Sequence, residues 1–251
     1  SHYLGQNFAK AFDVKYSNKD GKLEYVWATS WGVSTRLMGA LIMTHSDDKG
    51  LILPPKIAPI QVVIIPVYKG KEDLKNISKV ALKIKNEIEL KGFSVKFDNR
   101  NNFKPGYKYN EYELKGVPLR IVVGARDLKN NLIELARRDT LTKSTIKIKD
   151  VVNVVDKTLL DIQKSLYQKA LIFRNNNITK VNSFIEFQNI INEKGGFISA
   201  HWDGTRETEE IIKKKTKASI RCIPFNNIKE EGVCVYSGKR SIQRVLFAKA
   251  Y

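Results

Sequence analysis

A hydroxyl pair and an arginine stand together where a helix is predicted to begin. Ser34 and Thr35 are followed directly by Arg36. The first turn of a helix presents free N–H groups and the positive end of its dipole, so an anion is stabilised there. The planar guanidinium of arginine binds phosphate oxygens in pairs. These residues allow a phosphate clamp at Arg36 or an ion pair from Arg36 to a local carboxylate such as Asp47 or Asp48, and by themselves they favour the ion pair.

Motifs for several other chemistries are missing from the sequence. It contains no GxxxxGK(S/T) phosphate loop, no GxGxxG after a strand, no HExxH and no CxxC pair. The three histidines are far apart along the chain, and neither cysteine stands in an electropositive helix-start context. A nucleophilic triad therefore has little support.

The charge balance points to a polyanionic partner. Lys and Arg number 44 against 26 Asp and Glu, which gives a formal net charge of +18, and such an excess favours nucleic acid. A membrane role is less favoured, because no run of about eighteen apolar residues could span a bilayer and no basic stretch carries a strong amphipathic face. The 42% of apolar residues excludes a disordered polymer.

The first residues indicate where in the cell the protein is expected and whether the chain is a fragment. The opening SHYLGQNFAKAF has no charged and then apolar leader, and two cysteines in 251 residues do not form a disulfide scaffold. We therefore expect a cytoplasmic protein. The chain has no initiator methionine and opens in the middle of a pattern, so we expect a fragment of a longer polypeptide.

The patterns of apolar residues divide the chain into three regions. The first, residues 1–58, is predicted to hold a strand over 24–31 and a short buried strand in GLILPP. Between them, a helix is predicted from a cap at Ser34 or Thr35 to about His45.

The second region, residues 59–160, alternates strands and helices. IQVVIIPV, FSVKF, PLRIVVG and LIELARRD are predicted to be strands, and helical patterns cover roughly 71–91 and GYKYNEYELKG. This alternation predicts a small α/β domain with a mixed or mostly parallel sheet. A helical pattern over 150–175 leads into the third region, residues 161–251, which is predicted to be a compact α+β unit.

Several segments, in their order along the chain, resemble one family. The first are SHYLGQNFAKAF, a strand ending in SW, and GVSTRLMGALIMTHSDDKGLILPPKIAPIQVVIIP; the later ones are ELKGVPLRIVVGARD, RRDT, RCIPF and RVLFAKAY. The first group resembles the third signature motif of class II aminoacyl-tRNA synthetases. The whole set is similar to prolyl-tRNA synthetases of the archaeal and eukaryotic type, and it covers essentially the whole chain.

The resemblance implies an architecture and an activity. Residues 1–58 would end a class II catalytic domain with its antiparallel sheet, 59–160 would be an α/β anticodon-binding domain, and 161–251 a small α+β C-terminal domain. The implied reaction is ATP-dependent ligation of L-proline to tRNA(Pro) through a prolyl-adenylate, by a homodimer. The chain would be the C-terminal half of such an enzyme, without a complete active site of its own. The alternative is a non-catalytic tRNA-binding or regulatory protein derived from a synthetase.

The resemblance also assigns residues to the catalytic centre. Arg36 would grip the γ-phosphate of ATP, with Mg2+ on the phosphate oxygens and Thr35 beside the nucleotide. His2 would approach both the proline and the ribose of the adenylate. The proline pocket is assigned to His2, Ser30, Trp31 and Gly32. For Trp31, ordinary core packing is the alternative.

In the anticodon-binding domain the resemblance assigns base recognition to four residues. They are Glu113, Arg120, Arg126 and Asp127. A carboxylate accepts hydrogen bonds from guanine N1–H and N2–H, and arginine donates to guanine O6 and N7, which suits the two guanines of proline anticodons. A solvated helix charge is the alternative for Glu113. Arg137 and Arg138 are expected to contact phosphates or to face solvent.

The third region departs from those relatives that bind zinc. They carry four cysteines, two in a C-x4-C-like stretch and two in a C-x-x-C. This chain has no cysteine near Trp202 and has Ser237 three residues after Cys234. A tetrahedral structural zinc needs four ligands, so we predict no zinc and no other metal site.

Without a metal, packing must hold this third region together. Phe187, Phe197 and Trp202 are expected to contribute to its core, and Cys222 is expected to be a buried thiol. The resemblance makes the C-terminal Tyr251 a candidate to approach the active site with its carboxylate.

Overall fold

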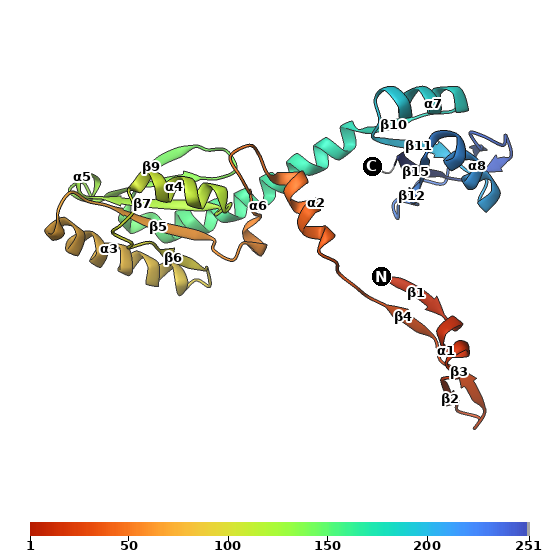
Figure 1. Cartoon of the computed structure of the whole chain (residues 1–251), viewed down its shortest axis with the longest axis horizontal. Helices are drawn as coiled ribbons and strands as arrows, with labels where there is room; N and C mark the ends of the chain where they lie inside the picture. The colour runs from red at the N-terminus through yellow and green to blue at the C-terminus, as the bar shows by residue number, and fades with distance from the viewer. Residues whose placement is uncertain (250–251) are drawn as a thin grey trace. The chain divides into compact units, whose positions relative to one another are not determined.

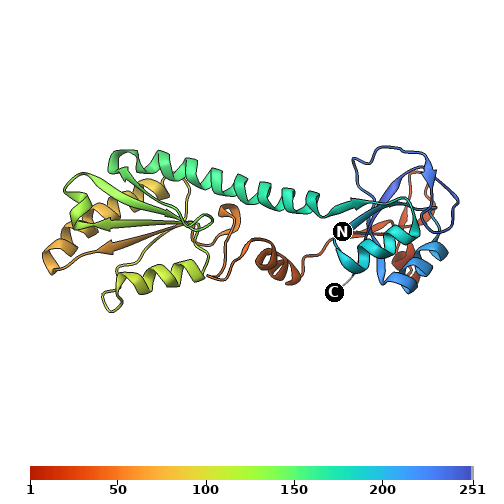
Figure 2. The same cartoon turned by 90° about the horizontal axis from the view of Figure 1, so that it is seen from above.

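The computed structural model describes residues 1–249, apart from the side chain of Lys71. The chain divides into two compact units, Ser1–Leu160 and Asp161–Tyr251, which are drawn in Figure 1 and, from above, in Figure 2. The boundary between the units falls within one long helix, α6 (Val151–Asn176). Tyr251, the candidate at the C-terminus, lies outside the described residues.

The first unit opens with two small antiparallel strand pairs and a short helix. These elements are β1 (His2–Gly5), α1 (Asn7–Ala11), β2 (Lys15–Ser17), β3 (Leu23–Tyr25) and β4 (Ala28–Ser30). Strand β1 pairs with β4, and β2 pairs with β3. The prediction of one strand over 24–31 is therefore wrong, because the two halves of that segment pair with different partners and Val26 and Trp27 separate them.

The helix predicted after the hydroxyl pair is present as α2 (Arg36–His45). The predicted hydroxyl cap is wrong, since the side chain of Thr35 makes no capping hydrogen bond. A capping residue needs an extended backbone, whereas Thr35 has a helical one, with φ −59° and ψ −13°. No side chain of α2 is buried, so this helix contributes nothing to a core within the described residues.

A five-stranded sheet forms the centre of the rest of the first unit. Its strands are β5 (Val62–Val67), β6 (Val95–Phe97), β7 (Leu119–Gly124), β8 (Leu132–Arg137) and β9 (Lys143–Lys147). They lie in the order β6-β5-β7-β8-β9. Strands β6, β5 and β7 are parallel, and β8 and β9 are antiparallel to their neighbours. The predicted mixed sheet is confirmed, but β9 was not foreseen, because KSTIK is an exposed and mostly polar edge strand.

Helices cover both faces of this sheet. They are α3 (Lys71–Glu89), α4 (Pro105–Leu114) and the short α5 (Ala125–Leu128), with 3-10 turns at Pro55–Ile57 and Ile148–Asp150. The chain moves outward from β5 to β6 through α3 and returns across β5 to β7 through α4. Because parallel crossovers are right-handed, this reversal places α3 and α4 on opposite faces, as Figure 2 shows.

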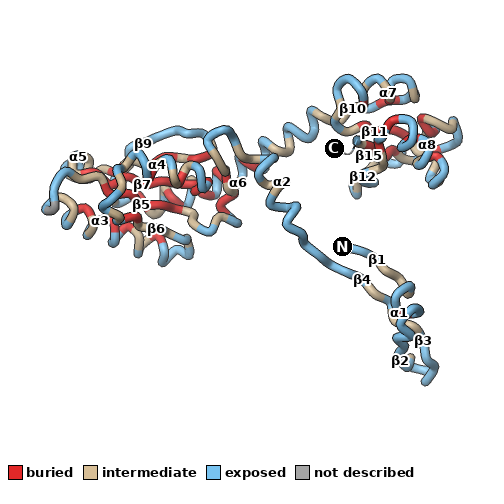
Figure 3. The backbone as a smooth tube through the Cα atoms, in the orientation of Figure 1, coloured by how far each residue is buried: buried red, intermediate tan, exposed pale blue. Residues whose placement is uncertain are grey.

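The sheet is buried because its central strands are continuous apolar runs, which is typical of parallel strands covered on both faces. Residues of β5 and β7 such as Ile64, Ile65 and Ile121 have no exposed surface. One stripe of α3 is buried at helical spacing: Ile77, Ala81, Ile84 and Ile88. On the other face of the sheet, Ile65 belongs to the cluster that contains Tyr112 of α4. Figure 3 shows the buried residues concentrated in these elements.

The prediction of a short strand in GLILPP is wrong. Residues 51–54 have no strand assignment. The amides of Leu51 and Leu53 instead donate to the carbonyls of Leu114 and Gly116, at 3.0 Å and 3.3 Å. The partner of this extended segment is thus the end of helix α4 rather than a strand.

The second unit is an α+β fold, as predicted. After α6 come β10 (Ile178–Lys180), α7 (Phe184–Glu193), β11 (Phe197–His201), α8 (Arg206–Thr216), β12 (Ala218–Cys222), β13 (Gly232–Val233), β14 (Arg240–Ser241) and β15 (Arg244–Lys249). The main sheet has the order β10-β11-β15-β12, and β13 pairs with β14. Phe187 and Phe247 lie at the centre of its core, with Trp202 packed against it.

The environment of one cysteine differs from the prediction. Cys222 is exposed, whereas Cys234 is buried. Cys222 ends the edge strand β12, after an irregularity in the pairing of β12 with β15 that follows Ile220. This shift in register takes the thiol out of the alternation that buries Ala218.

Candidate nucleic-acid interface

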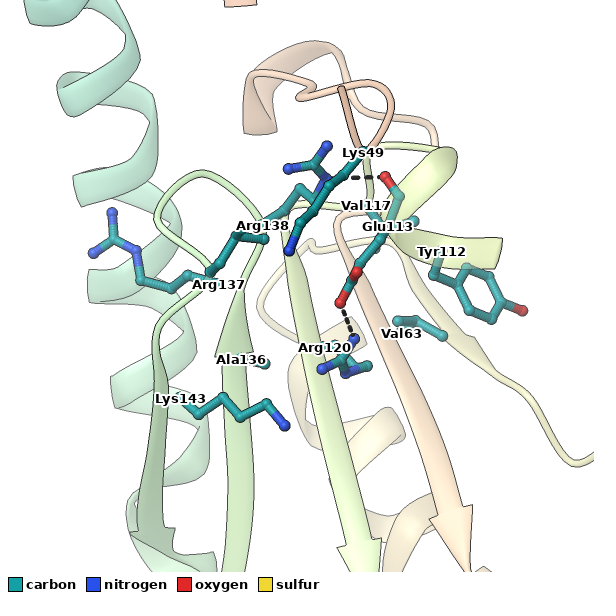
Figure 4. A pocket seen from close by; sticks show the side chains of 11 residues that line it. Lys49, Val63, Tyr112, Glu113, Val117, Arg120, Ala136, Arg137, Arg138 and Lys143 are labelled. Carbon is teal, nitrogen blue, oxygen red and sulfur yellow. Dashed lines mark hydrogen bonds and ion pairs between the residues drawn. The ribbon is translucent and has the colours of Figure 1, made fainter. Parts of the chain in front are cut away.

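A basic pocket lies where α4 ends above strands β5, β7 and β8, and Figure 4 shows the side chains that line it. Its charged lining residues are Lys49, Glu113, Arg120, Arg137, Arg138 and Lys143. Five of these six are cations, and Glu113 is the single anion among the charged residues lining this pocket. A pocket with this balance suits a polyanion that also offers hydrogen-bond donors, as a nucleotide does.

Two of the residues predicted to read bases meet in this pocket. Arg120 extends from the buried strand β7 and donates from Nη1 to Oε1 of Glu113 at 2.8 Å. The guanidinium also lies over the ring of Tyr109, 4.2 Å from its centre. The Glu113 side chain is 28% exposed. Glu113 is thus an oriented carboxylate at the mouth of a pocket and not a freely solvated helix charge.

The other two predicted readers lie at a neighbouring pocket, at the carboxyl ends of β5 and β7. Arg126 and Asp127 line it on α5, and Lys143 and Tyr109 line it from β9 and α4. Arg126 is 94% exposed, with its Nε 3.8 Å from Oδ1 of Asp127. Because Lys143 lines both pockets, the four predicted residues surround one continuous part of the surface.

Several contributors to this surface were not predicted, among them Lys49, Tyr109 and Lys143. Tyr109 carried a usable signal, because it precedes Glu113 by four residues on a helix and must share its face. Burial raises the pKa of the Tyr109 hydroxyl, which keeps it a neutral donor. Lys49 and Lys143 carried no such signal, since the fold brings them from distant parts of the chain.

The prediction that Arg138 contacts phosphates or faces solvent is wrong. Its side chain is 2% exposed and forms a bidentate ion pair with Asp47, with Nη2 to Oδ1 at 2.6 Å and Nη1 to Oδ2 at 2.9 Å. The bonds from Arg138 lower the pKa of Asp47 to about 2. Arg137 forms a separate ion pair, in which Nη2 lies 2.8 Å from Oδ2 of Asp139.

The residues assigned to the catalytic centre lie in the exposed N-terminal segment. Arg36 forms no hydrogen bond or ion pair with another described residue, and its suggested partner Asp47 is bonded to Arg138 instead. Across the β1–β4 pair, His2 lies opposite Ser30. The side chain of Trp31 is 85% exposed.

The remaining two members of that group, Thr35 and Gly32, are also exposed. A side chain added at Gly32 would meet nothing within 4 Å. The segment therefore brings His2 and Ser30 together, and it leaves Arg36 and Trp31 free of contacts that would bury them.

The carboxylate of Asp203 links the segment around Trp202 to the segment around Cys234, the two places where zinc ligands were considered and not expected. Oδ2 of Asp203 accepts hydrogen bonds from Ser237 Oγ at 2.6 Å and Thr208 Oγ1 at 2.8 Å. Oδ1 accepts from the hydroxyl and the amide of Thr205. Although burial would raise the pKa of Asp203, these bonds lower it to about 2. Among the described residues no group of three or more His, Cys, Asp or Glu could hold a metal ion.

Three side chains of the second unit resemble a nucleophilic triad in type. Nδ1 of His201 lies 3.1 Å from Ser241 Oγ, and its Nε2 lies 3.8 Å from Glu230 Oε1. However, Ser241 Oγ donates its proton to the carbonyl of Gln243 at 2.9 Å, so it has none to give to the imidazole. Ser241 is also 4% exposed, and Glu230 is bonded to Arg244. The group is a buried structural network.

None of the helices in the described residues is both long and apolar enough to cross a membrane.

Comparisons with known proteins match a segment in each of the two compact units. A family model described as "Anticodon binding domain" matches residues 61–158, which contain the five-stranded sheet and both pockets. A second, described as "Prolyl-tRNA synthetase, C-terminal", matches residues 184–251.

Curated relatives align with the chain from end to end. A protein of Christiangramia forsetii named Proline–tRNA ligase is 59% identical over 251 residues, which is 100% of this chain and 51% of the relative. Proteins of the same name from Porphyromonas gingivalis and Flavobacterium psychrophilum are 60% and 58% identical over the same shares. The chain thus spans about half the length of these relatives. With a mixed α/β sheet where the anticodon-binding match falls, and 59% identity across all 251 residues of this chain, the chain belongs to the prolyl-tRNA synthetase family.

Proposed function

We propose that this chain serves as the C-terminal half of a proline–tRNA ligase, which joins L-proline to tRNA(Pro) at the expense of ATP through a prolyl-adenylate. The similarity of all 251 residues to about half the length of proteins of that name supports this proposal. The net charge of +18 also supports it, because binding of tRNA depends on neutralising its phosphates.

The observation that carries the proposal is the oriented carboxylate of Glu113. Arg120 holds one carboxylate oxygen, Oε1, and Oε2 forms no hydrogen bond with another described residue. That free oxygen, at the mouth of a cationic pocket, can accept from the N1–H and N2–H of a guanine that has left its stack. The ion pair with Arg120 fixes the orientation of the Glu113 carboxylate before the base arrives.

The second pocket supplies complementary groups. Arg126, which is almost fully exposed, can donate to guanine O6 and N7, and Asp127 can accept from a base edge. Tyr109 and Tyr68 line the same pocket and offer aromatic faces for stacking. We assign the two pockets to two neighbouring bases of the anticodon.

In the first step of the proposed reaction, which forms the prolyl-adenylate, we assign the binding of ATP to Arg36. An arginine with no ion-pair partner among the described residues, in the first turn of α2, is available to neutralise charge that grows on pyrophosphate as the proline carboxylate attacks the α-phosphate. Mg2+ would arrive on the phosphate oxygens of the nucleotide. His2, Ser30, Trp31 and Gly32 would form the wall of the proline pocket, with Thr35 near the nucleotide.

A place in a larger catalytic domain would account for the exposed apolar surface of residues 1–46. Met38 and Met43 are 66% and 77% exposed on α2. We propose that residues 1–58 complete a class II catalytic domain whose other elements cover these side chains, that 59–160 bind the anticodon and that 161–251 form the C-terminal domain. The enzyme is expected to act as a homodimer.

The test is binding of an RNA hairpin that carries a proline anticodon, followed by fluorescence anisotropy. Glu113→Gln should raise Kd by the equivalent of about 1–3 kcal/mol, because one base loses its acceptor. The matched control is Glu89→Gln on α3, which also removes one negative charge but breaks a surface pair with Lys85. Wild-type affinity should also fall steeply with salt.

Two results would contradict the proposal. One is equal affinity for the proline hairpin and for a hairpin in which adenines replace the two guanines. The other is an equal effect of Glu113→Gln and Glu89→Gln. Hairpin recognition without proline activation, in a polypeptide that also carries the rest of the catalytic domain, would favour the non-catalytic alternative.

A further inference from the structure

The segment that leads out of α2 is bound along the end of α4. We call residues 47–53 the strap. Two strap amides, those of Leu51 and Leu53, donate to carbonyls at the C-terminal end of α4, as described above. The strap begins two residues after α2 ends, so it links the helix that carries Arg36 to the pocket that contains Glu113.

Two glycines make this contact closer than side chains would allow. A Cβ added to Gly50 would lie 2.5 Å from the Cα of Leu114, and one added to Gly116 would lie 2.7 Å from the carbonyl carbon of Leu51. Both glycines also have positive φ, +130° and +69°, which disfavours any other residue. The strap and the end of α4 are therefore packed backbone to backbone.

Arg138 joins the same two elements through its side chain. Its Nη1 and Nη2 bind Asp47, Nη2 also donates to the carbonyl of Gly50 at 3.1 Å, and Nε donates to the carbonyl of Glu113 at 2.9 Å. One guanidinium thus contacts the strap at three acceptors and α4 at a fourth. Because it is buried, separating it from these acceptors would leave an uncompensated charge, at a large cost.

The acceptor on α4 belongs to the residue that faces the pocket. The carboxylate of Glu113 is bonded to Arg120, its carbonyl is bonded to Arg138, and both arginines line the pocket. A base that pulls on the Glu113 side chain therefore acts on the peptide group that holds Arg138. A displacement of that peptide group would reach Asp47 through Arg138, since the pair is bidentate and geometrically specific.

We propose that Arg138 is a positioning residue that couples occupation of the Glu113 pocket to the strap, and through the strap to helix α2 and Arg36. This proposal rests on the proposed function, since it takes the occupant to be an anticodon base. A coupling of this kind is reciprocal: whatever stabilises the strap also favours the occupied pocket by the same factor.

Hydrogen exchange on the whole 251-residue chain tests the coupling. The probe is the hairpin with a proline anticodon, and the readout is the change in exchange of the Leu51 and Leu53 amides when the hairpin is added. In the wild type we expect exchange at least fivefold slower with the hairpin. The variants Arg138→Lys, which keeps the charge but loses the fork, and Asp47→Asn should lose this RNA-dependent change while Kd rises no more than about fivefold.

The control is a second bidentate pair in the same domain. Arg100 binds Asp98 through Nε and Nη2, at 2.9 Å and 2.7 Å, and forms no hydrogen bond or ion pair with the described residues of the strap. Arg100→Lys should leave the RNA-dependent change intact. A merely structural Arg138 would alter exchange equally with and without RNA, so the difference between the two conditions isolates the coupling.

The outcomes are distinct. Wild-type binding of the hairpin without slower exchange at Leu51 and Leu53, or a change that persists in both variants, would overturn the coupling and leave the proposed function in place. A wild-type chain that fails to bind the hairpin would overturn the proposed function itself.

Discussion

Residues 1–46 and residues 61–158 carry similar apolar side chains but bury them very differently. Among residues 1–46, Ala9 alone is buried, whereas Trp31, Leu37 and Met43 are 85%, 60% and 77% exposed. In the α/β region the strands β5 and β7 are almost completely buried. Figure 3 shows the same contrast in colour. The period of the apolar residues predicts an element in both regions, but burial requires a partner surface, and only the α/β region finds one among the described residues.

The largest effect should come from a matched pair of core and surface truncations. Ile121→Ala in β7 should lower the free energy of unfolding by about 2–5 kcal/mol, because it opens a cavity in a close-packed core. Ile42→Ala in α2, where the side chain is 45% exposed, should change it by less than about 0.5 kcal/mol. Urea denaturation measures both. A large loss for Ile42→Ala would mean that α2 is packed within the isolated chain.

The second test addresses chemistry instead of stability. In a proline–tRNA ligase that carries this chain as its C-terminal half, Arg36→Ala should slow proline-dependent pyrophosphate exchange about 100- to 1,000-fold, since one charge-stabilising group is lost. The stability of the chain and its affinity for the anticodon hairpin should not change, because Arg36 touches neither the core nor the pockets. Normal pyrophosphate exchange would remove Arg36 from the mechanism.

Acid should distinguish the two regions through a buried carboxylate. Burial would raise the pKa of Asp98, but the bonds from Arg100 and the charge of Lys108 overcome this and lower it from 3.8 to about 2. Because the folded pKa lies below the unfolded one, the stabilisation is complete above about pH 4 and is lost as the pH falls through 2. It amounts to about 2 kcal/mol.

This loss is measured by urea denaturation at pH 5 and pH 2. The advantage of the wild type over Asp98→Asn should shrink between the two. In residues 1–46 the bond from Lys15 also lowers the pKa of Asp13, but that pair is exposed, so Asp13→Asn should make no difference at either pH. An effect of Asp13→Asn would contradict the exposure of this segment.

The smallest effect extends the comparison to the second unit. Asp203→Ala should destabilise that unit by up to about 2 kcal/mol, because a carboxylate that accepts from three side chains is lost. Asp203→Asn, which keeps part of the acceptor set, should lose less. Thermal unfolding followed by circular dichroism checks both, and equal stability of all three proteins would show that packing alone holds these loops.

Local patterns predicted most elements but missed those whose identity depends on a partner. The edge strand β9 escaped because an exposed strand needs no apolar alternation. The segment GLILPP looked like a strand and is extended, but it pairs with a helix end. Cys222 looked buried because the apolar residues of RCIPF follow it, and an irregularity in the β12–β15 register exposes it.

The candidate site shows the same division. Glu113 and Arg120 are seven residues apart in sequence and could be assigned from motifs, and the structure brings them to 2.8 Å. Lys143 joins the pockets only because β8 and β9 form a hairpin. Arg138 was expected at the surface beside Arg137, yet it lies in the turn directly after β8, where its side chain is buried in an ion pair with Asp47.

By itself the sequence determined the alternation of strands and helices in the α/β region, the continuous apolar runs that bury it, the excess of cations and the motifs of its family. These follow from residues close together in the chain, whose spacing is set by the period of a helix or a strand. The tertiary structure alone decided which charges are paired. Asp47 stood near Arg36 in sequence but bonds to Arg138, 91 residues away, because ion pairs form between groups that the folded backbone brings together, whatever their separation along the chain.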